Sequence, residues 1–227
     1  MGDGSLSITP LRPLVRSILL AAVLVALQGP GLARDAAPVA SKRPDANAAF
    51  GLNLVWAARW QTWVPAIYYP GYWQIPYPGG DVPWYIGVCT DVLVRAYRSL
   101  GVDLQREVHQ AGVGSGDSSI DHRRVEVLRT FFARKGTSLP VTRNADDYLA
   151  GDIVTYYVPT GNSSTTHIAI VSDRKATGGA PLIIHNRGYG VQEENRLFAE
   201  KITGHYRYWP QARKPAAPTG SGAAQGD

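Results

Sequence analysis

The chain has 227 residues, of which 44% are hydrophobic and 18% charged, a composition that excludes an intrinsically disordered protein. Its formal net charge is +5, but the Lys and Arg residues are spread along the sequence without interleaved aromatic clusters, so we expect no nucleic-acid partner. The mild positive charge favours solubility and, more weakly, attraction to an anionic polymer such as a bacterial cell wall.

The N-terminus has the pattern of a secretory signal. Arg12 and Arg16 precede the apolar run Ile18–Leu27, which is shorter than the roughly 20 residues of a membrane-spanning helix. Small residues follow, ending at Ala33. We therefore predict a signal peptide over residues 1–33, cleaved after Ala33, and a periplasmic or secreted bacterial protein with no stable membrane span. An uncleaved anchor is the less favoured alternative.

Composition divides the rest of the chain. Residues 34–48 are rich in Ala, Pro and charge, which is typical of a linker. Residues 212–227 are low in complexity and predict a disordered tail. One folded domain is expected between them, over residues 49–211.

The domain begins with helical spacing of apolar residues over 49–64, which Pro65 ends. The next segment, 68–85, is dense in Tyr, Trp, Pro and Gly. Its prolines argue against a regular helix or an interior strand, and its aromatic content argues against a free linker. We expect an ordered loop that forms one wall of a groove.

Two further helices are predicted. Apolar residues recur every three to four positions over 89–100, with Gly101 as a stop signal. A second stripe runs over 121–135, with Asp121 as an N-terminal cap and Gly136 as the end.

The second half of the domain changes to short segments rich in β-branched and aromatic residues. They lie at 152–158, 167–172, 181–185 and 205–209. Such segments predict strands of an antiparallel sheet. Helices followed by strands give an α+β domain, with N-terminal helices packed on a small antiparallel sheet.

Cys89 is the only cysteine, so an exported chain has no internal disulfide. It falls in the first turn of the predicted helix 89–100, where unpaired N–H groups and the helix dipole stabilise a thiolate. A nucleophile is one interpretation, and a small buried core residue is the other.

A cysteine nucleophile needs a base and a group that orients it. His167 opens one predicted strand and His185 ends the next, and antiparallel neighbours bring such positions together. This favours a line of Cys89, His167 and His185. Spacing alone does not decide the matter, because a histidine at a strand end is more often a surface residue.

Four motifs resemble the NlpC-type branch of the papain-like cysteine peptidases. They are GVCTD at 87–91, GDIVTYY at 151–157, HIAIVSD at 167–173 and IIHN at 183–186. A wider set is similar to a bacterial family of unknown function in that superfamily: GGDVP at 79–83, IDHRRV at 120–125, IHNRGYG at 184–190 and GHYRY at 204–208. The resemblance covers roughly residues 48–209.

The resemblance implies a papain-like fold, with Cys89 as nucleophile, His167 as general base and His185 as the orienting residue. Asn186 is the alternative for the third role. Relatives place a tyrosine about a dozen residues before the cysteine, near the oxyanion, which points to Tyr77. Simple packing of Tyr77 is slightly favoured over this role.

Two carboxylates are candidates for substrate contact. Asp91 stands two residues after the cysteine, where the better-known enzymes have a different motif. It favours the helix N-terminus, opposes a nearby thiolate and is a candidate to bind a cationic or amide group of the substrate. Asp81 follows Gly79-Gly80, where a turn is favoured over a substrate contact. For residues 121–124 (DHRR), a solvated helix start is favoured over an anion or substrate site.

These features predict an exported thiol hydrolase that cleaves amide bonds, most plausibly in peptidoglycan stem peptides or cross-links. We expect a monomer without a cofactor, since the sequence has no metal-ligand spacing, phosphate loop or dinucleotide fingerprint. The alternatives are an inactive wall- or protein-binding module of the same fold, and a papain-fold acyltransferase or deamidase.

Overall fold

A computed structural model describes residues 46–159 and 164–210 of the chain. The predicted signal peptide, nearly all of the predicted linker and the predicted tail lie outside these residues. Within them, no helix is both long and apolar enough to cross a membrane.

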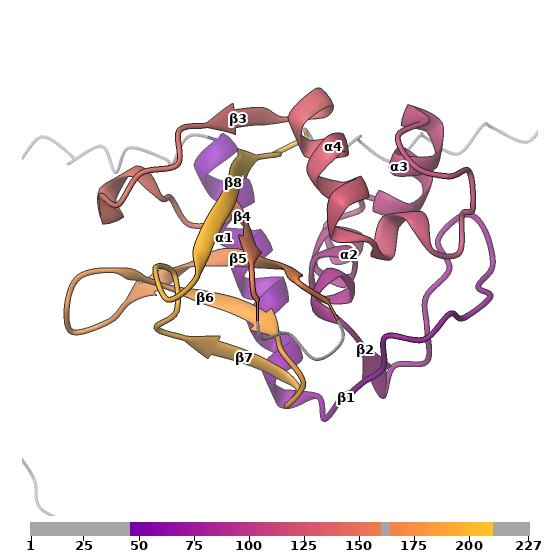
Figure 1. The fold of residues 1–227 in the computed structure, drawn as a ribbon, viewed down its shortest axis with the longest axis horizontal. Helices are drawn as coiled ribbons and strands as arrows, with labels where there is room; N and C mark the ends of the chain where they lie inside the picture. The colour runs from indigo at the N-terminus through magenta and orange to yellow at the C-terminus, as the bar shows by residue number, and fades with distance from the viewer. Residues whose placement is uncertain (1–45, 160–163, 211–227) are drawn as a thin grey trace, which may run out of the picture. The chain divides into compact units, whose positions relative to one another are not determined.

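Four α-helices form the first half of the domain (Figure 1). They are α1 (Ala46–Trp60), α2 (Cys89–Ser99), α3 (Leu104–Ala111) and α4 (Val125–Lys135). Single turns of 3-10 helix lie at Gln61–Trp63, Asp121–Arg123 and Ala145–Asp147. The helices predicted over 89–100 and 121–135 are confirmed as α2 and α4, although the second is shorter because Asp121–Arg123 forms a separate 3-10 turn.

The second half forms one antiparallel sheet of six strands in the order β3-β8-β4-β5-β6-β7. The strands are β3 (Thr137–Leu139), β4 (Ile153–Tyr157), β5 (Thr166–Lys175), β6 (Pro181–Asn186), β7 (Val191–Glu194) and β8 (Lys201–Arg207). A parallel pair, β1 (Ile67–Tyr68) with β2 (Ile86–Gly87), lies outside this sheet. The predicted α+β class, with helices packed on an antiparallel sheet, is confirmed.

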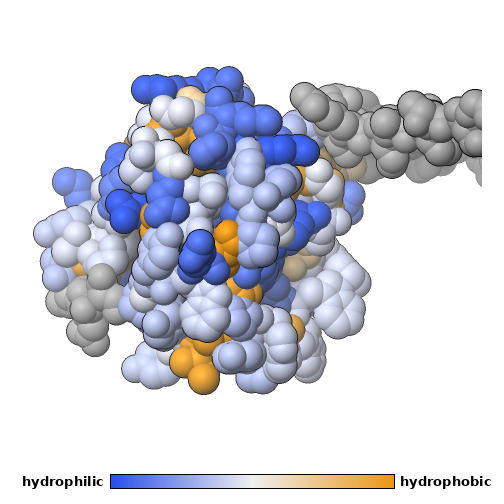
Figure 2. Space-filling view, turned by 90° about the vertical axis from the view of Figure 1, so that its right-hand side faces the viewer, coloured by the Kyte–Doolittle hydropathy of each residue, from blue (hydrophilic) through white to orange (hydrophobic). Residues whose placement is uncertain are grey.

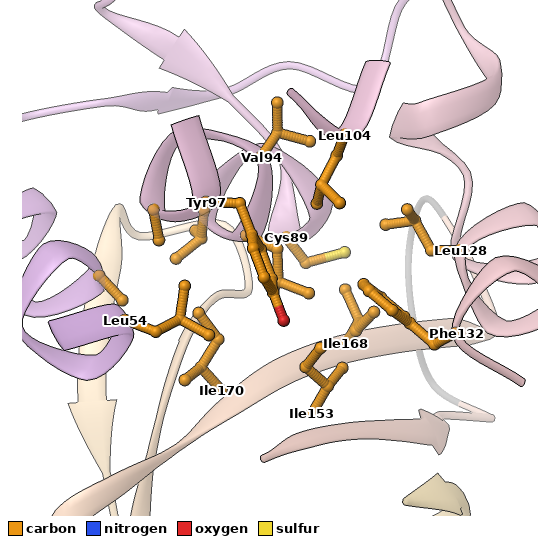
Figure 3. Close-up of a cluster of buried hydrophobic side chains, with 14 of the residues drawn as sticks. Leu54, Cys89, Val94, Tyr97, Leu104, Leu128, Phe132, Ile153, Ile168 and Ile170 are labelled. Atoms are coloured by element: carbon orange, nitrogen blue, oxygen red, sulfur yellow. The ribbon is translucent and has the colours of Figure 1, made fainter. Parts of the chain in front are cut away.

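Alternation along the strands gives the sheet two apolar faces. On one face Ile153, Ile168 and Ile170 pack with residues of α1, α2 and α4. Figure 3 shows this core, with Cys89 lying among Tyr97, Leu128 and Ile168. The opposite face carries a second buried cluster that includes Val154, Tyr156, Ala169, Val171 and Ile183. Burial of both faces explains why these strands are nearly continuous in apolar residues.

Helix α1 is fixed to the sheet by a close backbone approach and by one arginine. A side chain at Gly151 (φ +86°) would overlap Gly51, so both positions need glycine for α1 to lie against the entry to β4. Arg59, near the C-terminal end of α1, donates to Glu193 of β7 at 2.7 and 2.9 Å and to Ser172 of β5 at 3.0 Å. Together these contacts position the sheet edge that carries β5, β6 and β7.

Candidate active site

Cys89 is the first residue of α2, and the local sequence explains why the helix begins there. Val88 precedes it in extended conformation, and the Val88 N–H donates to Asp91 Oδ2 at 2.7 Å. A carboxylate in the first turn satisfies an unpaired amide and favours the positive end of the helix dipole. The thiol is buried, with Cys89 only 4% exposed.

The Cys89 sulphur is surrounded by backbone N–H groups. In order of importance, the N–H groups of Ile168, Thr90 and Cys89 itself favour the thiolate, while Asp91 opposes it. Burial outweighs them all and raises the pKa of the thiol to about 12. Cys89 is therefore a neutral thiol at pH 7 in the free protein. The Ile168 contact brings the sulphur to the peptide bond that follows His167.

A groove of about 310 Å³ opens beside Cys89. Its walls come from the aromatic segment, from α2 and α4, and from the start of β5. The lining residues are Tyr68, Pro70, Tyr72, Val88, Cys89, Ile120, Arg123, Arg124, Val125, Glu126, Ser164 and Thr166. The expectation that the aromatic segment forms a groove wall is thus confirmed for its first residues.

The tyrosine beside the thiol is Tyr68 and not Tyr77. Burial first, and then the neighbouring Cys89 and Asp91, raise the pKa of Tyr68 well above its ordinary value, and the phenol lies next to the Cys89 thiol. Tyr77 instead packs on the ring of His109 in α3, 4.8 Å between ring centroids, and is 42% exposed. Tyr77 thus packs against α3 and is not among the residues that line the groove.

Two histidines and a glutamate form a continuous hydrogen-bonded line. His167 Nε2 lies 2.7 Å from His185 Nδ1, and His185 Nε2 lies 2.9 Å from Glu194 Oε1. The first bond joins the start of β5 to the end of β6, and the second crosses from β6 to β7. Both imidazoles are buried, whereas the Glu194 side chain is 35% exposed. Within 46–159 and 164–210, no hydrogen bond joins the thiol to either imidazole.

Both imidazoles of this line are neutral at pH 7. Burial lowers the pKa of His167 well below its usual value, with His185, Arg187 and Arg196 acting in the same direction. Burial also lowers the pKa of His185 to about 4, although Glu194 opposes the shift. A neutral imidazole has one bare ring nitrogen and is a proton acceptor, as a general base requires.

Asp91 is not available to a substrate. Its Oδ1 and Oδ2 accept from Arg123 Nε at 2.9 Å and Nη2 at 3.0 Å, and both side chains are at most 3% exposed. Thr90 Oγ1 also donates to the Arg123 carbonyl at 2.9 Å. The expectation of a substrate contact at Asp91 is therefore corrected: this carboxylate joins the cysteine-bearing helix to the segment before α4.

The 121–124 segment is not a solvated helix start either. Asp121, His122 and Arg123 are buried, and only Arg124 is exposed. The Asp121 carboxylate does not cap α4, because it accepts from the N–H groups of Ser115 and Gly116 instead. This part of the chain is a structural corner, and of residues 121–124 only Arg124 is exposed where the corner meets the groove.

Asp81 and Asn186 also have internal partners. Asp81 accepts from Arg95 Nε at 2.9 Å and from Arg98 Nη1 at 2.8 Å, both on α2. These ion pairs leave it fixed to the helix and not directed at the groove. Asn186 is buried, and its Oδ1 accepts from the Gly188 N–H at 3.0 Å. Between the two candidates for a third residue, His185 is the one bonded to His167.

Three residues of the site were missed from the sequence. Arg123 and Tyr68 stood in motifs or segments that were recognised, but their partners depend on tertiary contacts. Glu194 had no signal, since a glutamate near a strand end is common. A cross-strand argument would have found it: on one face of an antiparallel pair, a residue two positions beyond the direct partner is still within reach. The described ranges hold no cluster of three His, Cys, Asp or Glu suited to a metal ion.

Comparison with known proteins finds similarity in sequence and, separately, in fold. It is 42% identical over 205 residues to the uncharacterized protein YijF of Escherichia coli (strain K12), covering 85% of this chain and 98% of the relative. Its fold is similar to the structures of NlpC2 and NlpC1 from Trichomonas vaginalis, each with a TM-score of 0.43 and 18% identity over 75% of this chain. The chain spans about half of those two solved chains, 49% and 47%.

A family model, described as a domain of unknown function (DUF1287), matches residues 55–208. The match includes Cys89, both histidines of the hydrogen-bonded line and Glu194. It also includes both ends of the Asp91–Arg123 pair, which join the GVCTD and IDHRRV motifs. The expected membership in a family of unknown function is confirmed, and the chain belongs to the DUF1287 family.

Proposed function

We propose that this protein is an exported thiol hydrolase that cleaves amide bonds, with Cys89 as nucleophile, His167 as general base and His185 as the residue that orients the base. One observation carries the proposal. Cys89 begins a helix with its sulphur held at the amide that follows His167, and His167 is in turn hydrogen-bonded to His185. The helix start that carries Cys89 therefore lies beside the start of β5, the strand that carries His167, and this supports the assignment of nucleophile, base and orienting group.

The raised thiol pKa favours general-base catalysis over a standing thiolate–imidazolium pair. In the free protein Cys89 keeps its proton and His167 is neutral. When a substrate enters the groove, the proton moves from sulphur to the free ring nitrogen of His167 while sulphur attacks the amide carbonyl. The proton then passes to the leaving amine, and water releases the acyl group from Cys89.

The negative charge that develops on the carbonyl oxygen needs donors. The Cys89 N–H is the first, because it lies at a helix N-terminus and points toward the sulphur. The Tyr68 hydroxyl is the second, because it lies against the thiol at the wall of the groove. Removing one donor of this kind lowers kcat by about 10²–10³-fold.

Cell-wall peptides are the proposed substrates. The sequence supports export and a mild positive charge, and the groove beside Cys89 is open at the surface. Peptidoglycan is an anionic polymer whose stem peptides offer amide bonds with nearby carboxylates. Arg124 is exposed at the groove, with no ion pair among the described residues, and would attract such a carboxylate.

Incubation of the purified protein with peptidoglycan, followed by mass mapping of released fragments, tests this proposal. Wild-type protein is expected to release muropeptide fragments, and Cys89→Ala and His167→Ala to release none while keeping the wild-type circular dichroism spectrum. Full activity in folded Cys89→Ala protein would sink the proposal. Tyr77→Phe is a matched control, because Tyr77 packs on His109 away from the groove.

A second candidate is a module that binds wall peptides without cleaving them. The observation in its favour is the burial of Cys89, which leaves a poorly reactive thiol. Retained affinity for peptidoglycan in both wild type and Cys89→Ala, without released fragments from either, would support it. Acyl transfer and deamidation use the same three residues, and the mass of the products distinguishes them from hydrolysis.

A further inference from the structure

Glu194 lies at the far end of the hydrogen-bonded line, on β7, an element that no sequence pattern connects with catalysis. In the β6–β7 pair, His185 is opposite Gln192 and Ile183 is opposite Glu194. Glu194 is thus the diagonal neighbour of His185 on the same face of the sheet, within reach of its ring. Its Oε1 lies 2.9 Å from His185 Nε2.

The neighbouring carboxylate shows that this position is specific. Glu193 points to the opposite face, where it is bonded to Arg59 of α1. Within the residues described, Glu194 has no arginine or lysine partner, and its side chain is hydrogen-bonded to His185 alone. Because its carboxylate is hydrogen-bonded to a single imidazole, Glu194 is placed to determine which tautomer that imidazole adopts.

A carboxylate fixes the direction of every hydrogen bond in this line. An ionised glutamate only accepts, so His185 carries its proton on Nε2 and donates to Glu194. A neutral His185 then has a bare Nδ1, which accepts, so His167 carries its proton on Nε2. The remaining nitrogen, His167 Nδ1, is left bare. The chain of donors thus determines which nitrogen can take a proton.

We propose that Glu194 is a positioning residue that holds His185 and His167 as their Nε2–H tautomers and thereby leaves His167 Nδ1 as the proton acceptor for Cys89. The inference rests on the proposed function for its catalytic consequence, but not for the tautomers themselves. In the reaction the Cys89 proton moves to His167 Nδ1, and no proton needs to reach Glu194. The carboxylate stabilises the resulting imidazolium through His185.

Other charged groups near the two imidazoles also shift their pKa values. Arg187 and Arg196 disfavour protonation of both rings, and each is itself paired with Glu200, at 3.0 and 3.1 Å. From β4, the Tyr156 ring lies 6.2 Å from that of His167. Among these groups only Glu194 is both hydrogen-bonded to one of the imidazoles and negatively charged. Its removal is therefore expected to change the tautomers and to make protonation of His167 less favourable.

The experiment measures tautomers and activity separately. Histidine ring 15N shifts at pH 7, recorded by long-range 1H–15N correlation, distinguish protonated from bare nitrogens. Wild type is expected to show both His167 and His185 as Nε2–H. In Glu194→Gln the amide can accept from His185 or donate to it, so a mixture of tautomers is expected. Glu193→Gln, on the same strand but the other face, is expected to keep the wild-type pattern.

On peptidoglycan fragments, Glu194→Gln is expected to lower kcat about 10–100-fold with little change in KM, as for other groups behind a catalytic residue. The acid limb of its pH–rate profile is expected to move relative to wild type, which a merely structural role would not cause. Glu194 is partly exposed and makes one hydrogen bond, so the variant is expected to fold.

The two proposals fail differently. The role of Glu194 is overturned if the wild type shows Nδ1–H tautomers. It is also overturned if Glu194→Gln keeps the tautomers, kcat and pH profile of wild type while Cys89→Ala is inactive. Absence of hydrolysis in all variants, with tautomers that still change in Glu194→Gln, would overturn the proposed hydrolase and leave the tautomer assignment standing.

Discussion

Replacing Asp91 with asparagine tests whether the buried Asp91–Arg123 pair holds the cysteine-bearing helix in place. The substitution keeps the side-chain shape but leaves the Arg123 guanidinium buried without a counter-charge. Breaking a buried pair in this way costs about 3–5 kcal/mol. The asparagine oxygen keeps one neutral hydrogen bond of about 1 kcal/mol. The free energy of unfolding is therefore expected to fall by about 2–4 kcal/mol.

Thermal and urea unfolding followed by circular dichroism measure this change. For a domain of this size the expected loss lowers Tm by roughly 4–16 °C. Asp146→Asn is the matched control, because its pair with Lys175 is 3.4 Å long and its side chains are 81% and 56% exposed. Such a pair contributes about 0–1 kcal/mol, so the control is expected to unfold almost like wild type.

A double variant separates the buried charge from the loss of packing. Asp91→Leu with Arg123→Met removes both charges and leaves apolar groups of similar size. Because no unpaired charge remains, it is expected to be more stable than Asp91→Asn, although the Val88 N–H loses its acceptor at a cost of about 1–3 kcal/mol. The reasoning is refuted if Asp91→Asn matches the Asp146→Asn control, or if the double variant loses as much as its two single substitutions together.

Three further predictions concern titration and the oxyanion. The pKa of Cys89 is raised to about 12 in the folded protein, against about 8.5 in the unfolded chain. Between these values the unfolded chain loses the thiol proton first, so the free energy of unfolding is expected to fall by roughly 2 kcal/mol from pH 8.5 to pH 10, as measured by urea unfolding. Cys89→Ala should lack this loss, and an equal loss in both proteins would count against a buried thiol. Burial lowers the pKa of His122 to about 4, so stability is lost as pH falls from 6.5 towards 4. The difference in unfolding free energy between wild type and His122→Gln is expected to change by roughly 2 kcal/mol from pH 7 to pH 5, and a pH-independent difference would exclude this role. Tyr68→Phe is expected to lower kcat on peptidoglycan fragments about 10²–10³-fold, and wild-type kcat would remove Tyr68 from the oxyanion site.

Periodicity predicted the elements whose own residues are strongly patterned. The stripe of α2 and the β-branched runs of β4, β5 and β6 were visible because both sheet faces are buried. Two elements gave no such signal. Helix α3 has apolar residues mainly at Leu104 and Val108, and β7 (VQEE) is mostly acidic. Both form because neighbouring elements supply their partners: α3 packs on the Asp121–Arg123 turn, and β7 pairs with β6.

The site was predictable in its order along the chain but not in its contacts. Cys89 was selected at a predicted helix start, His167 and His185 at the ends of neighbouring strands, and the resemblance to NlpC-type peptidases supplied their roles. The structure bonds the two histidines to each other. Tyr68 was missed because the count of residues before the cysteine pointed to Tyr77. Strands β1 and β2 pair in parallel, which places Tyr68 opposite Gly87, two residues before Cys89. A loop of seventeen residues, 69–85, therefore separates neighbours in space.

The charged residues in the sequence motifs mainly hold the fold. Asp152 of the GDIVTYY motif accepts from His205 Nε2 at 2.9 Å and from Arg207 at 2.7 and 2.8 Å, which joins it to the GHYRY motif. Asp91 joins GVCTD to IDHRRV in the same way. These carboxylates have partners inside the protein, so they are poor candidates for binding a substrate.

The exposed side chains on the groove walls are the candidates for recognising a substrate. Once the motif carboxylates are assigned to internal ion pairs, the exposed groups that remain on the groove walls are not part of the His167–His185–Glu194 line. They include Tyr72, Arg124 and Glu126, and Glu126 Oε1 already accepts from Thr166 at 2.7 Å. Only Arg124 offers an exposed charge without a bonded partner among the groove residues described. If the proposed hydrolase is correct, replacing Arg124 is therefore expected to change the choice of substrate more than the cleavage step itself.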